Sequence, residues 1–194
     1  MKTMTETLRP TIVSLALFTV LCGVVYPLCS TVALQSLFAA QAQGSLITGK
    51  DGKALGSELI GQNFSDTKYF WGRLSATSPY AYNAAASGGS NFGANNPALL
   101  DAVKARVTVL KAADPANNNA IPIDLATASG SGVDPHISPA AAEYQIARVT
   151  KARGLNEAAV RELVKKYSET RQFGMLGEPT VNVLKLNLAL DGKI

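Results

Sequence analysis

A long stretch without charge near the amino-terminal end sets the first limit on the structure of this chain. No Asp, Glu, Lys or Arg occurs between Arg9 and Lys50, and Leu, Val, Ile, Ala and Phe dominate Thr11 to Leu34. At about 1.5 Å rise per residue, these roughly 24 residues form a helix of about 36 Å, enough to cross a hydrocarbon core of about 30 Å. The sequence therefore predicts a membrane-spanning helix over residues 11–34.

Two prolines lie in or next to this helix. Pro10 suits the first helical turn, where its missing N–H group would have no partner in any case. Pro27 lies inside the apolar run and predicts a kink, which membrane helices tolerate better than soluble helices.

A cleaved signal peptide is the alternative interpretation of the same stretch. Ala40-Gln41-Ala42 offers an Ala-x-Ala cleavage site, and Lys2 and Arg9 make a basic leader. The apolar run is about twice as long as a usual signal core and ends well before Ala42, which favours a retained anchor. A mature protein that starts at Gln43 would rule the anchor out.

The charges around the helix predict its direction. Lys2, Arg9 and the free amine precede the apolar run with only Glu6 opposing them, which favours a cytoplasmic amino terminus. We therefore expect residues 1–10 inside the cell, one crossing over residues 11–34, and residues 45–194 as an exported domain.

Composition excludes several classes of protein. The chain has 18 Lys and Arg against 14 Asp and Glu, and the two signs are interspersed instead of forming the basic stripe of a nucleic-acid binder. Both cysteines, Cys22 and Cys29, lie in the apolar run, and His136 is the only histidine. The domain therefore has neither disulfides nor a metal site built from Cys or from two His ligands.

The exported part mixes strand and helix signals. Short apolar runs on either side of Asp51-Gly52 predict a β-hairpin over residues 45–55. Residues 121–127 predict an edge strand, because Pro122 cannot donate to a ladder on both sides. Leucines at every second position over residues 181–190 predict a half-buried strand. Residues 72–96, rich in Ser, Gly, Asn and Ala, predict an ordered loop or a partner surface.

Capping residues predict three helices. Asn96 with Pro97, Ser138 with Pro139, and Asn156 each provide the first turn of a helix, and Gly154 is placed to end the second. The first of these helices carries an apolar stripe that we expect to face inward, made of Leu99, Leu100, Val103, Val107 and Leu110. Together these elements predict a single small α+β domain after one membrane helix.

Long stretches of the chain resemble the C subunit of the Kdp potassium-transporting ATPase. They are YFWGRLSATSPYAYNAAASGGSNFGANNPALL at 69–100, TASGSGVDPHISPAAAEYQIARV at 127–149 and GEPTVNVLKLNLALD at 177–191. The opening LRPTIVSLALFTVLCGVVYPL at 8–28 is also similar to the anchor of that family. The resemblance implies a bacterial inner-membrane protein that works with a channel-like potassium-translocating subunit and a P-type ATPase subunit.

The residues themselves indicate an accessory role in such an assembly. The chain contains no Asp-Lys-Thr-Gly segment to accept phosphate and no GxxxxGK[ST] loop. One crossing without intramembrane charge cannot form an ion pathway. We therefore expect no catalytic residue and no firmly bound cofactor in this chain, with ATP met at most through the complex.

The resemblance also implies a link to nucleotide. The family is described as a catalytic chaperone that assists ATP binding by the ATPase subunit, and by position the glutamine proposed to touch ATP is Gln145. An exported domain conflicts with this role, because ATP is cytoplasmic; the alternative for Gln145 is a helix-surface amide or a partner contact. Ser87-Gly88-Gly89-Ser90 resembles the signature loop of transporter ATPases, although a tight turn explains it equally well. A domain that binds nucleotide directly is the second functional hypothesis.

An aromatic segment beside the loop of small residues predicts a partner surface, because aromatic residues and Arg are favoured at interfaces. The residues expected to contact the potassium-translocating subunit are Tyr69, Phe70, Trp71, Arg73, Ser87, Gly88, Gly89, Ser90 and Asn91. For Phe70 and Trp71 the alternative is a place in the core of the domain.

A membrane-anchored hydrolase is the remaining alternative. Ser129, Ser131, Asp134 and His136 offer a nucleophile, an acid and a base. All four lie within a few residues of one another and the GxSxG elbow is missing, whereas hydrolases assemble such groups from distant segments. A local turn at Asp134, followed by a helix cap, explains the same residues better.

Overall fold

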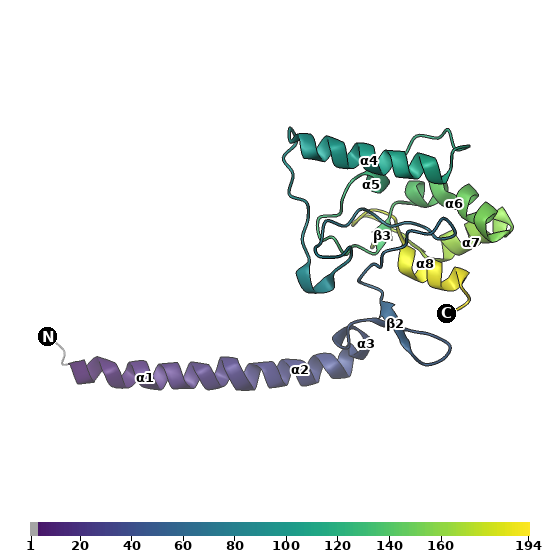
Figure 1. Ribbon diagram of the computed structural model, residues 1–194. Helices are drawn as coiled ribbons and strands as arrows, with labels where there is room; N and C mark the ends of the chain where they lie inside the picture. Colours follow the sequence, from purple (N-terminus) through teal and green to yellow (C-terminus); the bar gives the residue numbers. More distant parts are fainter. Residues whose placement is uncertain (1–3) are drawn as a thin grey trace. The chain divides into compact units, whose positions relative to one another are not determined.

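The computed structural model describes residues 4–194, which divide into two compact units with the boundary at Ser45. The first unit is almost entirely helical (Figure 1). The second unit, from Leu46 onward, is a small α+β domain with two sheets, as the sequence predicts.

The first unit is a long apolar helix. Helix α1 (Met4–Val20) passes through a π-helical turn (Leu21–Val25) into α2 (Tyr26–Leu37), and a short α3 (Ala39–Ala42) follows. Residues Glu6–Leu37 are long and apolar enough to cross a membrane. Their large apolar side chains are exposed, as expected of side chains that face lipid.

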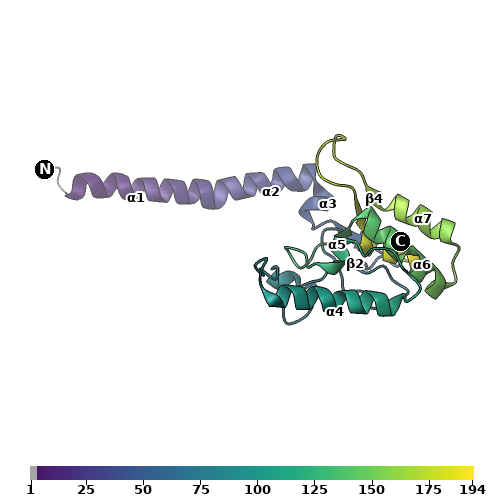
Figure 2. The ribbon, with the colours of Figure 1, turned by 90° about the horizontal axis from the view of Figure 1, so that it is seen from above.

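The π-helical turn is the local response to Pro27. Tyr26 donates its N–H to the carbonyl of Leu21, one residue further back than in an α-helix. Pro27 follows directly and has no N–H to donate. Helix α1 continues into α2 without a sharp bend in Figures 1 and 2, so the prediction of a kink is wrong, and a wider turn takes its place.

The domain opens with the predicted hairpin. Strands β1 (Leu46–Thr48) and β2 (Ala54–Ser57) pair antiparallel, with Ile47 opposite Gly56. Gly52 has a φ of +78°, which explains why glycine follows Asp51 in the connecting loop.

The second sheet has three very short strands in the order β3-β5-β4. The central strand β5 (Thr180–Asn182) pairs antiparallel with β3 (His136–Ile137) on one side and with β4 (Ser168–Glu169) on the other.

The three predicted helices are confirmed. They are α4 (Pro97–Ala113), α6 (Pro139–Arg153) and α7 (Glu157–Lys166). The side chains of Asn96, Ser138 and Asn156 accept hydrogen bonds from backbone N–H groups in the first turns of these helices. Gly154 ends α6 in the left-handed conformation, with φ +63°.

Two predicted strands are wrong. Within 121–127 the chain forms the short helix α5 (Ile123–Ala126), and only Thr180–Asn182 is a strand at the carboxyl-terminal end. Residues Val183–Leu190 form the helix α8, whose first turn Asn182 caps by accepting the N–H of Lys185. The alternating leucines wrongly predicted a strand because α8 is buried on nearly all sides. A helix buried in this way does not need its apolar residues on a single face.

The core lies between α6, the three-stranded sheet and the segment around Phe70. Its largest fully buried apolar side chains are Phe70, Leu125, Ile137, Ile146, Leu184, Leu186, Val149, Val160 and Val181. Helix α4 packs less completely: Leu110 is buried, but Leu100 is 58% exposed, so the prediction that the whole stripe faces inward is wrong for Leu100.

Candidate functional site

The segment Tyr69–Arg73, which the sequence singles out, runs through the domain without joining either sheet. Asn187 of α8 accepts the N–H of Phe70 at 2.9 Å and donates to its carbonyl at 2.9 Å. Gln145 of α6 does the same for Trp71, at 2.8 and 3.1 Å. Two side-chain amides therefore take the place of neighbouring strands and satisfy backbone groups that burial would otherwise leave unpaired.

Gln145 has no remaining capacity for a ligand in this structure. Besides Trp71, its amide donates to the carbonyl of Ala141 at 3.1 Å, and its oxygen accepts from Arg148 at 2.7 Å. These four hydrogen bonds use both donors and both acceptor positions of the amide. The residue is 1% exposed, so the expectation of a surface amide is wrong.

Two guanidinium groups lie over the Trp71 ring. Arg148 is 4.5 Å and Arg106 is 5.3 Å from the ring centre, and the indole N–H donates to the carbonyl of Asp66 at 2.9 Å. Burial lowers the pKa of Arg148 to about 10. Trp71 and Phe70 are buried, so of the two interpretations of these rings the structure supports a place in the core.

Tyr69 lies at the edge of the same segment and is half-buried. Its hydroxyl donates to Asp191 at 2.9 Å, and Arg153 both pairs with Asp191 at 2.8 Å and covers the Tyr69 ring at 4.9 Å. Burial raises the pKa of Asp191, but hydrogen bonds from Arg153 and Tyr69 outweigh it, so the pKa is lowered on balance. These contacts tie the carboxyl-terminal end of α8 to the central segment.

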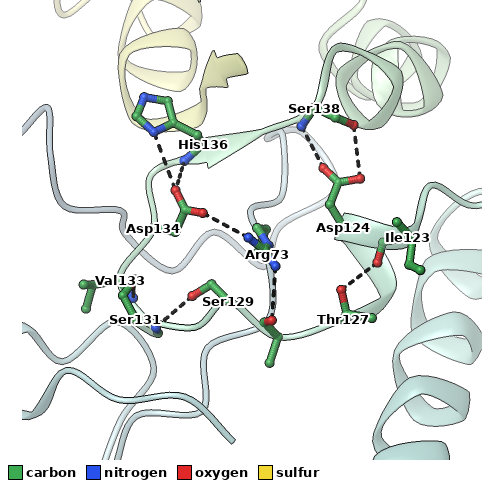
Figure 3. A network of polar contacts seen from close by, with 12 residues as sticks. Arg73, Ile123, Asp124, Thr127, Ser129, Ser131, Val133, Asp134, His136 and Ser138 are labelled. Carbon is green, nitrogen blue, oxygen red and sulfur yellow. Dashed lines mark hydrogen bonds and ion pairs between the residues drawn. The ribbon is translucent and has the colours of Figure 1, made fainter. Parts of the chain in front are cut away.

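Arg73 reaches the loop that precedes β3. It pairs with Asp134 at 3.2 Å and donates to the carbonyl of Ala128 at 3.2 Å, as Figure 3 shows. Within residues 4–194 its Nε is buried without a hydrogen-bond partner. Asp134 also accepts the backbone N–H of His136 at 2.9 Å, with the Nδ1 of the same residue 3.5 Å away. Burial raises the pKa of Asp134, but these bonds from His136 and Arg73 outweigh it and leave the pKa lowered.

The hydroxyl groups of the suspected hydrolase residues serve the backbone of this loop. Ser129 accepts the N–H of Gly132 at 2.7 Å, and Ser131 accepts that of Val133 at 3.2 Å (Figure 3). Among the described residues, neither serine is hydrogen-bonded to His136. The arrangement is that of a turn before the cap of α6, and it offers no activated nucleophile.

The loop of small residues packs against the same turn. Ser87 donates to the carbonyl of Ser131 at 3.0 Å, and the N–H of Gly88 donates to that carbonyl at 2.9 Å. A Cβ at Gly89 would lie 2.9 Å from the carbonyl oxygen of Gly130, so only glycine permits this approach. Ser90 is half-buried, whereas Asn91 is exposed with φ +52°.

A groove of about 390 Å³, which the sequence did not reveal, lies beside Ser90. One wall is α4 and the other comes from residues 74–76, from Ser90 and Phe92, and from residues 126–128. Its apolar lining includes Leu74, Phe92, Leu99, Val103 and Val109. The helical stripe and Phe92 are visible in the sequence, but only the fold shows that the stripe is partly open.

The structure therefore divides the predicted partner residues into two groups. Phe70 and Trp71 belong to the core, with Tyr69 at its margin. Arg73 and the loop 87–91 gather around the turn at 128–134. In the part of the chain that the structure describes, no group of three or more His, Cys, Asp or Glu side chains could hold a metal ion.

Comparison with known proteins identifies the family of this chain. A family model described as KdpC, the K+-transporting ATPase c chain, matches residues 8–192. The potassium-transporting ATPase KdpC subunit of Methylococcus capsulatus is 62% identical over 183 residues, covering 94% of this chain and 96% of that protein. That of Polaromonas naphthalenivorans is 62% identical over 188 residues, covering 97% and 95%. That of Herpetosiphon aurantiacus is 57% identical over 183 residues, covering 94% of each. Because the match runs along almost the whole sequence, from the apolar helix to the end of α8, the chain belongs to the KdpC family of K+-transporting ATPase subunits.

Proposed function

We propose that this chain is a non-catalytic accessory subunit of an ATP-driven potassium uptake complex. Its amino-terminal helix anchors it in the inner membrane with residues 1–10 in the cytoplasm, and its domain stabilises the assembly from outside. The observation that carries the proposal is the long apolar helix at Glu6–Leu37, whose large apolar side chains are exposed, in a member of this family. Such a helix is stable only in lipid or against other membrane helices.

The absence of a phosphate-accepting segment and of a nucleotide loop from the sequence supports an accessory role. Ion movement and phosphoryl transfer then belong to a channel-like subunit and a P-type ATPase subunit, the partners we propose. The hydroxyl groups of Ser129 and Ser131 accept backbone N–H groups of a turn, and the Nδ1 of His136 lies 3.5 Å from Asp134, which also favours a non-catalytic chain.

We further propose that any assistance to ATP binding is indirect. Direct contact through Gln145 would require breaking four hydrogen bonds and exposing Trp71. An exported domain that stabilises the transporting subunit can instead favour a conformation in which the ATPase subunit binds nucleotide, because linked equilibria act in both directions.

The domain's contact with the potassium-translocating subunit is proposed to include the loop 87–91 and the adjoining groove. Phe92 lines this groove and is exposed on the domain surface. Apolar surface rimmed by polar loops is typical of a protein interface.

Co-purification tests this proposal. The full-length chain, co-expressed with the remaining subunits of its potassium-transporting ATPase and extracted in mild detergent, is expected to carry them through an affinity step. Phe92→Glu, which places a charge in the groove without touching the core, is expected to reduce their recovery several-fold. Recovery of the wild-type chain alone would contradict the accessory role, and undiminished recovery with Phe92→Glu would remove the groove from the contact.

A further inference from the structure

An apolar hairpin tip projects from the domain between β4 and β5. Three large side chains stand out in solvent here: Phe173 is 89%, Met175 is 76% and Leu176 is 59% exposed. No charged residue occurs from Gln172 to Gly177. In Figure 2 this loop extends from the domain on the side away from α4.

The tip has a defined structure in spite of its exposure. Gln172 and Leu176 pair through two backbone hydrogen bonds, at 2.8 and 2.9 Å. Met175 donates its N–H to Gln172 at 3.1 Å, which closes the turn. Arg171 pairs with Glu178 at 2.7 Å across the base. The apolar side chains are therefore displayed on a preformed hairpin.

Phe173, the first central residue of the turn, has a backbone conformation that is unfavourable for phenylalanine. Phe173 and Gly174, the two central residues, have φ of +54° and +74°. Turns with positive φ at both positions favour Asn-Gly or Asp-Gly, because most side chains are strained in the left-handed region. Phe173 therefore gains neither local stability nor burial within the domain, and its presence requires an explanation outside this chain.

We propose that the tip formed by Phe173, Met175 and Leu176 docks into an apolar recess on the outer face of a membrane-embedded subunit of the complex. This inference rests on the proposed function. The chain between the end of α2 and Leu46 spans at most roughly 30 Å, so the anchor keeps the domain close to proteins in the same membrane. A rigid hairpin loses little conformational entropy on docking, and Phe and Met are favoured in the buried centre of interfaces.

The charge of the tip selects a protein partner over the lipid surface. Arg171 is the nearest cation along the sequence, and its ion pair with Glu178 neutralises it. Loops that bind anionic lipid combine apolar side chains with an excess of Lys or Arg, which this tip lacks. An uncharged apolar recess is the complementary surface.

Phe173→Asn in the full-length chain tests the inference, because Asn suits the turn and removes the apolar side chain. We expect the variant to fold with an unchanged or higher melting temperature, followed by Trp71 emission, and to bind the other subunits at least about tenfold more weakly. Ile123→Asn is the matched control, because Ile123 is also an exposed apolar side chain, at 79%, but lies in α5. This control is expected to assemble like the wild type.

The outcomes separate this inference from the proposed function. If the wild type assembles and Phe173→Asn assembles equally well, or if Ile123→Asn is equally impaired, the docking tip is wrong while the accessory role stands. If the wild type does not assemble, the proposed function itself fails. A photo-cross-linking residue at position 173 identifies the occupant: adducts with another subunit support the inference, whereas adducts with lipid or with a second copy of this chain overturn it.

Discussion

At the scale of single residues, Gln145 and Asn187 perform the task of neighbouring strands for Phe70 and Trp71. Each amide both accepts from and donates to one backbone residue more than 70 positions away. A sequence cannot reveal such a pairing, because an amide on a predicted helix looks the same whether it faces solvent or a distant backbone. The sequence therefore draws attention to Gln145 without revealing that its amide is buried against the backbone of Trp71.

Gln145→Ala is expected to destabilise the domain by about 2–4 kcal/mol. The substitution leaves the buried N–H and carbonyl of Trp71 without partners and opens a small cavity. Urea unfolding of the full-length chain in detergent measures this, because Trp71 is the only tryptophan and is buried. Gln172→Ala, on the exposed hairpin, is the control and is expected to change stability by less than about 0.5 kcal/mol. A fully stable Gln145→Ala variant with impaired nucleotide response would favour direct ATP contact instead.

At the scale of elements, sequence signals worked where they were local. The helix starts at Asn96, Ser138 and Asn156 are predicted correctly, because capping depends only on the residue and its next three neighbours. The alternating leucines before Leu190 wrongly predicted a strand. Burial on nearly every side removes the polar face by which a helix is distinguished from a strand in the sequence. The partly open face of α4 could not be predicted either, since only the path of residues 74–92 leaves Leu100 exposed.

The cap of α8 is expected to matter more than the cap of α7. Asn182 is buried, accepts the N–H of Lys185, and also donates to the carbonyl of Glu58, which links the helix to the end of the first hairpin. Asn182→Ala should therefore lower the free energy of unfolding by about 2–4 kcal/mol. Asn156→Ala removes a single exposed cap and should lower it by about 1 kcal/mol. Equal effects in urea titrations would contradict the structural role assigned to Asn182.

At the scale of the whole molecule, the sequence predicted the division into an apolar helix and an α+β domain, because both features depend on composition over many residues. Membership of the KdpC family fits this division, since its model covers both parts. The proposed placement of the domain outside the cell rests on Lys2 and Arg9 before the helix. This placement decides whether the domain supports the transport subunit from outside or meets ATP directly.

A pair of reporters fused after Ile194 tests that placement most directly. Alkaline phosphatase folds into an active enzyme only outside the cytoplasm. The second reporter is a fluorescent protein that becomes fluorescent only in the cytoplasm. With the carboxyl terminus exported, the phosphatase fusion is expected to be active and the fluorescent fusion dark, with both retained in the membrane fraction. A bright fluorescent fusion with an inactive phosphatase fusion would contradict the account and bring the nucleotide-binding alternative forward.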